Sequence, residues 1–507
     1  MTLATKKGDS RHFLQKMGTT RSCRSCPFSP VLAAFFLCAL AVLRAQTPAP
    51  HAQTVTRHYT QQDQQAKRYV YVPVSVPAGT TSLTVSYKYD RAGGANTVDL
   101  GLYEPGPLTL GTRALRGYSG GAQDTVTVAV DHASPGYWPG PLAEGEWHVL
   151  LGLYQVGPAG VDVTVTTTVS SDPPTGATPK LQARNAGPIR RGAAWYAGAM
   201  HTHTTFSDGT LSPADLVDKA RGEKLDFVIL TDHNNTANQL VALDRPDLLV
   251  ITGEEVTTPG GHFNVWGLSG ERAYIDFRIQ PGDPAIKDVM KSAAERGGII
   301  SVNHPVTDCF ACTWTHDVPP SVNAWEVFNG TAEGRRQALA MWDLLLRAGR
   351  RLTGVGESDW HHGPAPIGSP TSRVWATELS ASAILKAVKD GHVIVMATTA
   401  LPPPDIAAHA ERVTARVGDE LTVPAGDPVS IDVTVDPDAY RGDRVDLVWR
   451  GETVAHAIVP ADGKLTFVRY PPEPGYFRVQ IAAPDGMLRA IANPIYITID
   501  PRAGRLR

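Results

Sequence analysis

The chain has 507 residues, with 47 lysines and arginines against 50 aspartates and glutamates, and a formal net charge of -3. This length exceeds that of one ordinary domain, and about two to four domains are expected. The charges are nearly balanced, with neither a basic stripe nor an RNA-binding motif, which argues against a nucleic-acid surface.

The beginning of the chain has the pattern of an export signal. Several basic residues precede the apolar run at 31–43. This run is short for a membrane span but has the length of a signal-peptide core. We therefore predict a signal peptide over 1–45, cleaved near Ala45, and a periplasmic or secreted protein. The alternatives are a lipoprotein, through Cys38, and a protein anchored in the membrane by an uncleaved signal.

Residues 54–170 have the alternating pattern of an all-β module. Strand-like segments such as RYVYVPVSV and VDVTVTTTV are separated by turns rich in Gly and Pro. Few helical segments interrupt them, which predicts an N-terminal β-sandwich. No ligand site is evident there, and we interpret the module as a packing or spacer domain. Residues 171–192, rich in Pro, Gly and polar residues, are predicted to be a linker.

From 193 to 400, short apolar strands are followed by polar residues, and helical segments separate several of them. His201 and His203 follow one such strand, and residues i and i+2 of a strand point to the same side. A helical segment then leads to the apolar strand 227–230, which is closely followed by His233. This is a βαβ unit with candidate ligands at the C-terminal ends of both strands, where α/β barrels place their chemistry.

The same pattern recurs further along the chain. A lone histidine is more often a packed or surface residue than a ligand. Repetition of His, Asp and Glu after successive strands instead indicates one shared site. The further candidates are Glu254, Glu255, His262, Asn303, His304, Asp359, His361 and His362.

Cys309 and Cys312 are the only cysteines that would remain after removal of the predicted signal, and they form a Cys-x-x-Cys after His304. In an oxidising compartment this spacing predicts a small disulfide that stiffens the loop. The alternatives are a redox motif and a structural zinc site, for which His316 and Asp317 are the nearby additional ligands.

Residues 405–500 form a second β-rich region. Segments such as KLTFVRYPP and YFRVQIAAPDG predict a small C-terminal β-sandwich, and no titratable cluster marks it as catalytic. The preceding LPPPD is either a flexible hinge or a segment that packs rigidly.

Together, the motifs HTHTTFSDG, TDH, GEE, NHP and GESDWH resemble those of the polymerase and histidinol phosphatase (PHP) domain. GHFNVWGL, WEVFNG at 325–330 and ANPIYI are similar to its carbaryl hydrolase-like (CehA/McbA) branch. The resemblance covers about 190–400 strongly, and the remainder to about 500 loosely. It implies a distorted (β/α)7 PHP barrel. With the two β-rich regions, we therefore predict a multidomain protein in which this barrel is flanked by an N-terminal and a C-terminal β-sandwich.

The resemblance also implies a set of ligands for two or three divalent metal ions. His201, His203 and Asp359 would hold the first metal, and Glu255 would bridge it to a second. His262 and His304 would bind the second metal. Asp208, His233 and His361 would fit a third metal, or the second in two-metal members. His, Asp and Glu without thiolates suit Zn, Mn or Fe. The full predicted set is His201, His203, Asp208, His233, Glu255, His262, His304, Asp359 and His361.

Other residues near these motifs have predicted roles around the metals. Asp232 is interpreted as a partner that orients an imidazole. The candidates for the general acid are His304, His262 and a metal-bound water. Arg373 is a candidate contact for an anionic substrate, with an ordinary surface arginine as the alternative. His362 has no counterpart in the family.

The chemistry of such a site agrees with hydrolysis. Two metals roughly 3.5–4 Å apart share a hydroxide that acts as the nucleophile. The chain has no P-loop. We therefore predict an exported metal-dependent hydrolase that acts on a small-molecule ester, preferentially a phosphoester. The alternatives are a carbamate or carboxylic ester hydrolase of the carbaryl hydrolase type and a non-catalytic metal-binding surface protein. The substrate, the native metal and the oligomeric state stay open.

Overall fold

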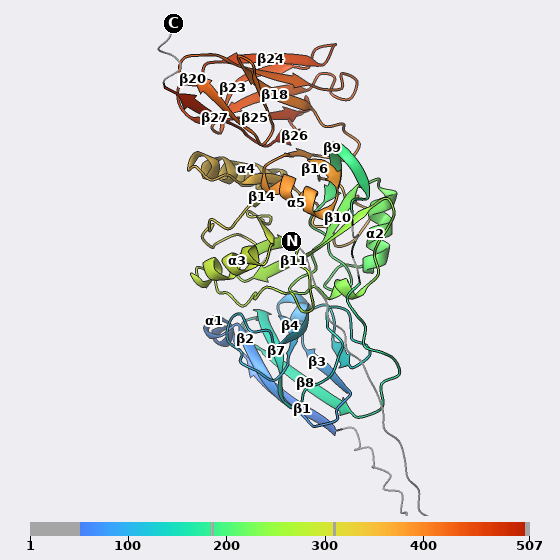
Figure 1. Ribbon diagram of the computed structural model, residues 1–507. Coiled ribbons are helices and arrows are strands. Elements are labelled where there is room, and N and C mark those ends of the chain that lie inside the picture. The colour runs from blue at the N-terminus through green and yellow to red at the C-terminus, as the bar shows by residue number, and fades with distance from the viewer. Residues whose placement is uncertain (1–50, 183, 185–186, 308–310, 502–507) are drawn as a thin grey trace, which may run out of the picture. The chain divides into compact units, whose positions relative to one another are not determined.

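The computed structural model of the protein describes residues 51–182, 184, 187–307 and 311–501 (Figure 1). The predicted signal peptide lies outside these residues. Among the described helices, none is both long and apolar enough to cross a membrane. Pro48–Arg507 groups as a single unit of the chain.

The N-terminal region contains two four-stranded antiparallel sheets that share one hydrophobic core and so form a sandwich. Buried residues alternate along β8 with exposed or half-buried ones, so one face of its sheet lies in the core and the other is partly open to solvent. In order, the first sheet consists of β1 (His51–Tyr59), β8 (Val161–Ser170), β3 (Ser82–Tyr89) and β6 (Thr125–Ala129). The second consists of β2 (Tyr69–Val76), β7 (Gly145–Gln155), β4 (Thr97–Tyr103) and β5 (Leu115–Gly120), and the short helix α1 (Gln61–Ala66) precedes β2.

The middle of the chain alternates strands with helices. Its strands are β9 (Arg190–Ala199), β10 (Phe227–Leu230), β11 (Leu249–Thr258), β12 (Gly261–Trp266), β13 (Ile299–Val302), β14 (Ala324–Phe328), β15 (Thr353–Gly356), β16 (Thr371–Leu379) and β17 (Val393–Met396). Its helices are α2 (Pro213–Gly222), α3 (Ala285–Glu295), α4 (Ala332–Arg347) and α5 (Ala381–Lys389). Helix α2 begins as its sequence predicts, because the Ser212 hydroxyl accepts a hydrogen bond from the Asp215 amide and Pro213 follows it.

These strands lie in one sheet in the order β15-β14-β13-β12-β11-β10-β9-β16-β17. Strands β9, β10 and β11 are parallel, whereas β12 and β16 pair antiparallel with their neighbours. The two ends of the series approach each other, since a Cβ added at Gly356 of β15 would lie 2.2 Å from Cγ1 of Val395 in β17. Among the described residues the sheet path nevertheless runs on from β17 into the C-terminal region, so a closed (β/α)7 barrel stays a prediction.

The C-terminal region is joined to the middle by this continuous sheet. Its strand β26 pairs antiparallel with β17, and the Asn493 side chain forms hydrogen bonds with the backbone N–H and C=O of Gly354. These contacts favour rigid packing over a hinge after LPPPD. The strands are β18 (Asp405–Ala410), β19 (Val413–Arg416), β20 (Glu420–Pro424), β21 (Val429–Thr434), β22 (Arg444–Trp449), β23 (Glu452–Ile458), β24 (Lys464–Arg469), β25 (Gly475–Ala482), β26 (Leu488–Ala492) and β27 (Ile495–Asp500).

Candidate metal centre

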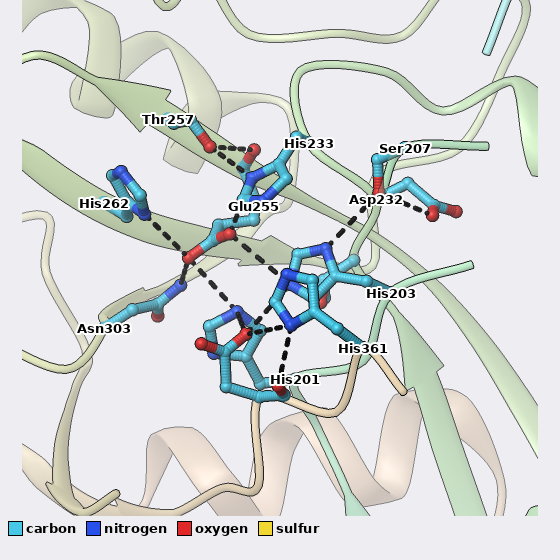
Figure 2. A network of polar contacts seen from close by, with 12 residues as sticks. His201, His203, Ser207, Asp232, His233, Glu255, Thr257, His262, Asn303 and His361 are labelled. Carbon is cyan, nitrogen blue, oxygen red and sulfur yellow. Dashed lines mark hydrogen bonds and ion pairs between the residues drawn. The ribbon is translucent and has the colours of Figure 1, made fainter. Parts of the chain in front are cut away.

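The structure brings the predicted metal ligands together at one edge of the central sheet. His201 and His203 directly follow β9, and His233 follows β10. The carboxyl ends of parallel neighbouring strands meet at the same sheet edge, which places these imidazoles side by side. Later elements complete the cluster, and Figure 2 shows from close by how its histidines at 201, 203, 233, 262 and 361 surround Glu255. Its remaining members are Asp208, Glu255, His262, His304, Asp359 and His361.

Glu255, on β11, lies at the centre of the cluster, and its two carboxylate oxygens face different imidazoles. Oε1 lies 3.1 Å from Nε2 of His201 and 3.2 Å from Nε2 of His304. Oε2 lies 2.8 Å from Nδ1 of His233 and 3.5 Å from Nε2 of His203. A carboxylate placed between groups of ligands in this way has the position that a bridge between metals requires.

The first group consists of His201, His203, Glu255 and Asp359. Nε2 of His201 and Nε2 of His203 each lie 3.0 Å from Oδ1 of Asp359. All three atoms are buried, and none of them has a partner in hydrogen-bond geometry despite these short distances. Buried polar atoms are rarely left in this state, and atoms that converge on one point without hydrogen bonds fit a cation between them. These residues therefore fit a metal ion.

A second group, His203, Asp208, His233 and His361, lies on the more exposed side of the cluster. Oδ1 of Asp208 is 3.3 Å from Nε2 of His361 and 3.6 Å from Nε2 of His233. His203 belongs to this group and to the first, so the two groups adjoin.

The third group contains His262 and His304, whose imidazoles both face Oε1 of Glu255. Nδ1 of His262 lies 3.4 Å from this oxygen, and Nε2 of His304 lies 3.2 Å from it. Cys312 lies close to both imidazoles but is disulfide-bonded, and a disulfide sulfur is not the thiolate that binds metals. The disulfide agrees with the predicted oxidised state. Its predicted partner, Cys309, lies outside the described residues.

The electrostatics of the cluster favour cation binding. Burial alone raises the pKa of Glu255, but the charges of His201, His233 and His262 outweigh it and hold that pKa well below its usual value. Burial, together with the neighbouring His361 and His233, lowers the pKa of His203 to about 3. The centre therefore offers an ionised carboxylate and a neutral imidazole, the two forms that metals require.

The backbone is strained at two of the ligands. His304 has a φ of 24° and Asp359 a φ of 51°, in the region that residues other than glycine rarely adopt. Strain of this kind concentrates at functional sites. The loop after β9 is also tightly folded, because a Cβ added at Gly209 would lie 2.3 Å from the carbonyl oxygen of His203.

Asp232 lies behind the imidazoles, as interpreted from the sequence. Its carboxylate accepts hydrogen bonds from the Thr204 amide at 2.8 Å and from the Ser207 hydroxyl at 3.1 Å. Oγ of Ser207 lies 3.4 Å from Nδ1 of His203. Asp232 thus acts on His203 through Ser207 rather than by direct contact.

Glu326, on β14, is a functional residue that sequence reasoning missed. Its Oε1 lies 3.3 Å from Nδ1 of His201, and its other oxygen accepts a hydrogen bond from the His304 amide. It therefore orients one imidazole and fixes the strained backbone that carries another. The only sequence signal was a carboxylate within the apolar strand AWEVF.

Two residues near the motifs are not brought into the centre. Arg373 donates a hydrogen bond to the carbonyl of Thr399 at 2.7 Å, and none of its described contacts is with a predicted metal ligand. His362 is exposed beside His361 and belongs to none of the ligand groups. The candidate role of Arg373 as a substrate contact thus has no support from its position.

A cavity of about 350 Å³ opens beside the centre and is lined by Asp208, His233 and His262. Its opposite wall comes from the N-terminal region. The residues on that wall are Arg91, Thr97, Asp99, Tyr118, Ser119, Gly120, Gly121, Ala122 and Tyr154. Another cavity, of about 390 Å³, is lined by Arg113, Arg272 and Arg296 among others but contains none of the predicted ligands, so we associate the chemistry with the smaller one.

No family model matches the chain. A segment of 99 residues is 29% identical to a 3',5'-nucleoside bisphosphate phosphatase of Chromobacterium violaceum, covering 19% of this chain and 32% of that protein. A segment of 102 residues is 30% identical to the 5'-3' exoribonuclease Rnm of Salmonella typhimurium, again covering 19% of this chain and 32% of that protein. The chain therefore spans about a third of the length of these relatives.

Among solved structures, the chain is similar to a two-domain protein from Bacteroides vulgatus that contains a predicted PHP-like metal-dependent phosphoesterase. The identity is 21% and the TM-score 0.35, with 62% of this chain and 100% of that chain covered. A TM-score this low does not establish the fold. Part of this chain is similar in sequence to phosphate-ester hydrolases. The carbaryl hydrolase-like branch finds no support in these comparisons and stays a prediction.

Proposed function

We propose that the protein is a metal-dependent phosphoesterase that hydrolyses a small-molecule phosphate ester. The observation that carries this proposal is the convergence of buried, unpartnered nitrogen and oxygen atoms around Glu255. The local similarity to a nucleoside bisphosphate phosphatase and to an exoribonuclease supports phosphate esters as the substrate class. In the reaction, the P–O bond to the leaving alcohol breaks, and water supplies the new oxygen on phosphorus and the proton on the alcohol.

Two or three divalent metals, when bound, would supply a water of lowered pKa and polarise the phosphoryl oxygens. The protein residues would hold these metals in place. Glu255 bridges the ligand groups, and Asp359 joins His201 to His203. Glu326 holds His201 in orientation from behind.

The cavity beside the centre favours a small substrate over a polymer. Its volume of about 350 Å³ lies in the range of small-molecule sites. Protein walls stand on both of its sides, from the metal loops and from the N-terminal region. A single phosphorylated organic group fits such a space.

The proposal is tested with the mature chain loaded with Mn or Zn. We expect two or three metals per chain and metal-dependent hydrolysis of p-nitrophenyl phosphate or bis-p-nitrophenyl phosphate. Turnover of 1-naphthyl N-methylcarbamate alone would replace the phosphoesterase with a carbamate hydrolase. Bound metal without turnover of any ester would instead favour a binding protein.

His203→Ala should lower kcat by about 10³-fold or more, because His203 belongs to two of the ligand groups. His362→Ala is the matched control, since its side chain is exposed and outside the ligand groups. Metal content measured by mass spectrometry should fall only in the His203 variant. Equal losses in both variants would contradict the assignment.

We further propose that the protein is exported through the signal at 1–45, a segment that lies outside the described residues. Its apolar core and the disulfide at Cys312 support this proposal. Cell fractionation combined with N-terminal sequencing of the product is the test. An uncleaved N-terminus in the membrane fraction would favour the anchored alternative, and a cytoplasmic product would contradict export.

A further inference from the structure

We propose that the N-terminal β-sandwich forms the substrate-selective wall of the active site, and that it binds a compact, ring-bearing leaving group carrying a hydrogen-bond donor. This inference rests on the phosphoesterase proposed above. It assigns the sandwich a role that its sequence did not indicate.

The sandwich lies directly against the loop that carries His203. A Cβ added at Gly136 would come within 2.6 Å of the Phe206 carbonyl oxygen and of the Tyr118 carbonyl oxygen. Only glycine allows the two segments to approach this closely. Tyr118, on β5, is thereby fixed beside the metal loop, and its ring also packs against Phe277, with ring centroids 4.8 Å apart. The wall is therefore in contact with the elements that carry the metal ligands.

This wall is held firmly in place. The Arg278 guanidinium donates hydrogen bonds to the carbonyls of Leu108 at 2.9 Å and Thr109 at 3.0 Å, and it is paired with Asp276. Both Arg278 and Asp276 are buried. The Asp276 oxygen of this pair, Oδ2, also accepts a hydrogen bond from the Gly111 amide at 2.8 Å. A buried network across the contact gives a fixed geometry, which a selective wall requires.

Asp99, on β4, is the polar group of the wall best suited to bind a donor. Its Oδ2 accepts a hydrogen bond of 2.7 Å from the Tyr118 hydroxyl, which holds the carboxylate at the cavity. Gly152 on the adjacent strand leaves room for it, because a Cβ there would lie 3.0 Å from Oδ2. Burial raises the pKa of Asp99 to about 6, so near neutrality the group is mainly an ionised acceptor.

The other wall residues define the shape of the occupant. Tyr118 and Tyr154 present aromatic surface, which suits a flat ring. The glycines at 120 and 121 leave the middle of the wall free of side chains. A ring fits between these features, and a hydroxyl or amide on it reaches Asp99. The only basic residue on this wall, Arg91, is paired with Asp124 at 2.8 Å.

Two isosteric ligands test the inference, because they differ only in the donor. Binding of 4-(hydroxymethyl)benzylphosphonate and 4-ethylbenzylphosphonate to the metal-loaded full chain is measured by calorimetry. Hydrolysis of the corresponding aryl phosphates gives a parallel ratio of kcat/KM. We expect the hydroxymethyl compound to be preferred about tenfold, as one hydrogen bond to a charged group allows. Asp99→Asn should bring the ratio close to one.

A second variant tests the shape of the wall. Gly121→Leu should weaken the binding of both benzylphosphonates about tenfold or more while leaving the binding of inorganic phosphate unchanged. A Cβ at this position makes only an ordinary contact, 3.6 Å from Cγ2 of Thr97, so folding should be preserved. Asp162→Asn is the matched control, since Asp162 belongs to the exposed His58 pair on the same sandwich.

The outcomes separate this inference from the proposed function. In one outcome no ester is hydrolysed, but the hydroxymethyl compound binds more tightly and Asp99→Asn abolishes that preference. This outcome would contradict the phosphoesterase and support the wall. In another outcome the esters are hydrolysed, but Asp99→Asn and Gly121→Leu bind the phosphonates as Asp162→Asn does. This outcome would contradict the wall and support the phosphoesterase. Equal binding of the two phosphonates by the wild-type chain would overturn the assignment of Asp99 as the acceptor for the donor.

Discussion

The two β-rich regions that flank the central sheet are attached to it in different ways. The C-terminal region continues the sheet itself through the β17–β26 pair, and none of its residues lines the cavity at the metal centre. The N-terminal region makes no strand pairs with the central sheet in the described chain, yet it supplies a wall of that cavity. Backbone pairing thus marks the region that supports the fold, and side-chain contact marks the region that we propose selects the substrate.

The two sheets of the N-terminal sandwich also differ from each other in how far they are buried. Strand β8 alternates buried residues with exposed or half-buried ones, whereas residues 149–153 of β7 are all buried. Continuous burial is expected of a strand covered on both faces. One sheet of the sandwich therefore faces solvent, and the other lies between the sandwich core and the middle of the chain.

The largest effect is expected where the C-terminal region is fixed to α4. Asp343 there is buried and binds Arg478 at 2.6 Å and the Tyr476 hydroxyl at 2.9 Å. Asp343→Ala leaves the arginine buried without its partner and should lower the free energy of unfolding by about 3–5 kcal/mol. Urea denaturation measures this change, and the ratio of kcat/KM for the two aryl phosphates should stay constant.

The control for this variant is Asp438→Ala, which removes an exposed ion pair with Arg441 and should cost less than about 1 kcal/mol. If the two variants were equally stable, the buried pair would not hold the C-terminal region. A change in the ratio of kcat/KM for the two aryl phosphates in Asp343→Ala would contradict the proposed distinction between the two regions.

A similar loss of stability, together with a change in selectivity, is expected from Arg278→Ala. This variant removes hydrogen bonds from a charged group to Leu108 and Thr109 across the N-terminal contact and leaves the buried Asp276 without its partner, at a cost of about 3–5 kcal/mol. The wall should loosen, and the preference for the hydroxymethyl ester should fall several-fold while the metal content stays the same. Arg416→Ala, in an exposed pair with Asp405, is the control. An unchanged preference would show that the wall does not depend on this contact.

The sequence allowed the ligands of the metal centre to be proposed because their positions depend on local rules. His201 and His203 share one side of a strand end, and the later motifs also follow strands, so the structure brings them together. Glu326 could not be found in this way, because a carboxylate in an apolar strand does not reveal which imidazole it meets.

The wall and the shared sheet were beyond prediction for a different reason. Asp99 and Tyr118 lie far from the metal motifs in sequence, and no periodicity connects a sandwich to a loop that follows it. One signal was present in EWHVLLGLYQV, whose apolar run contrasts with the alternation in VDVTVTTTV. That contrast predicts two-sided burial of β7 but does not identify what covers it. The pairing of β17 with β26 likewise depends on tertiary packing rather than on local pattern.

The smallest expected effect is a pH dependence of the proposed wall. Burial raises the pKa of Asp99 to about 6, the Tyr118 hydrogen bond and the charges of His233 and Arg68 oppose this, and Asp208 adds to it. The acceptor is ionised above that pKa, so the preference for the hydroxymethyl ester should rise about two- to fivefold as the pH increases through about 6. Taking the ratio of the two esters cancels the titration of the metal centre, because both esters share it. The ratio should be flat in Asp99→Asn, and a wild-type ratio that fell with rising pH would mean that the protonated carboxyl, as a donor, binds the substrate.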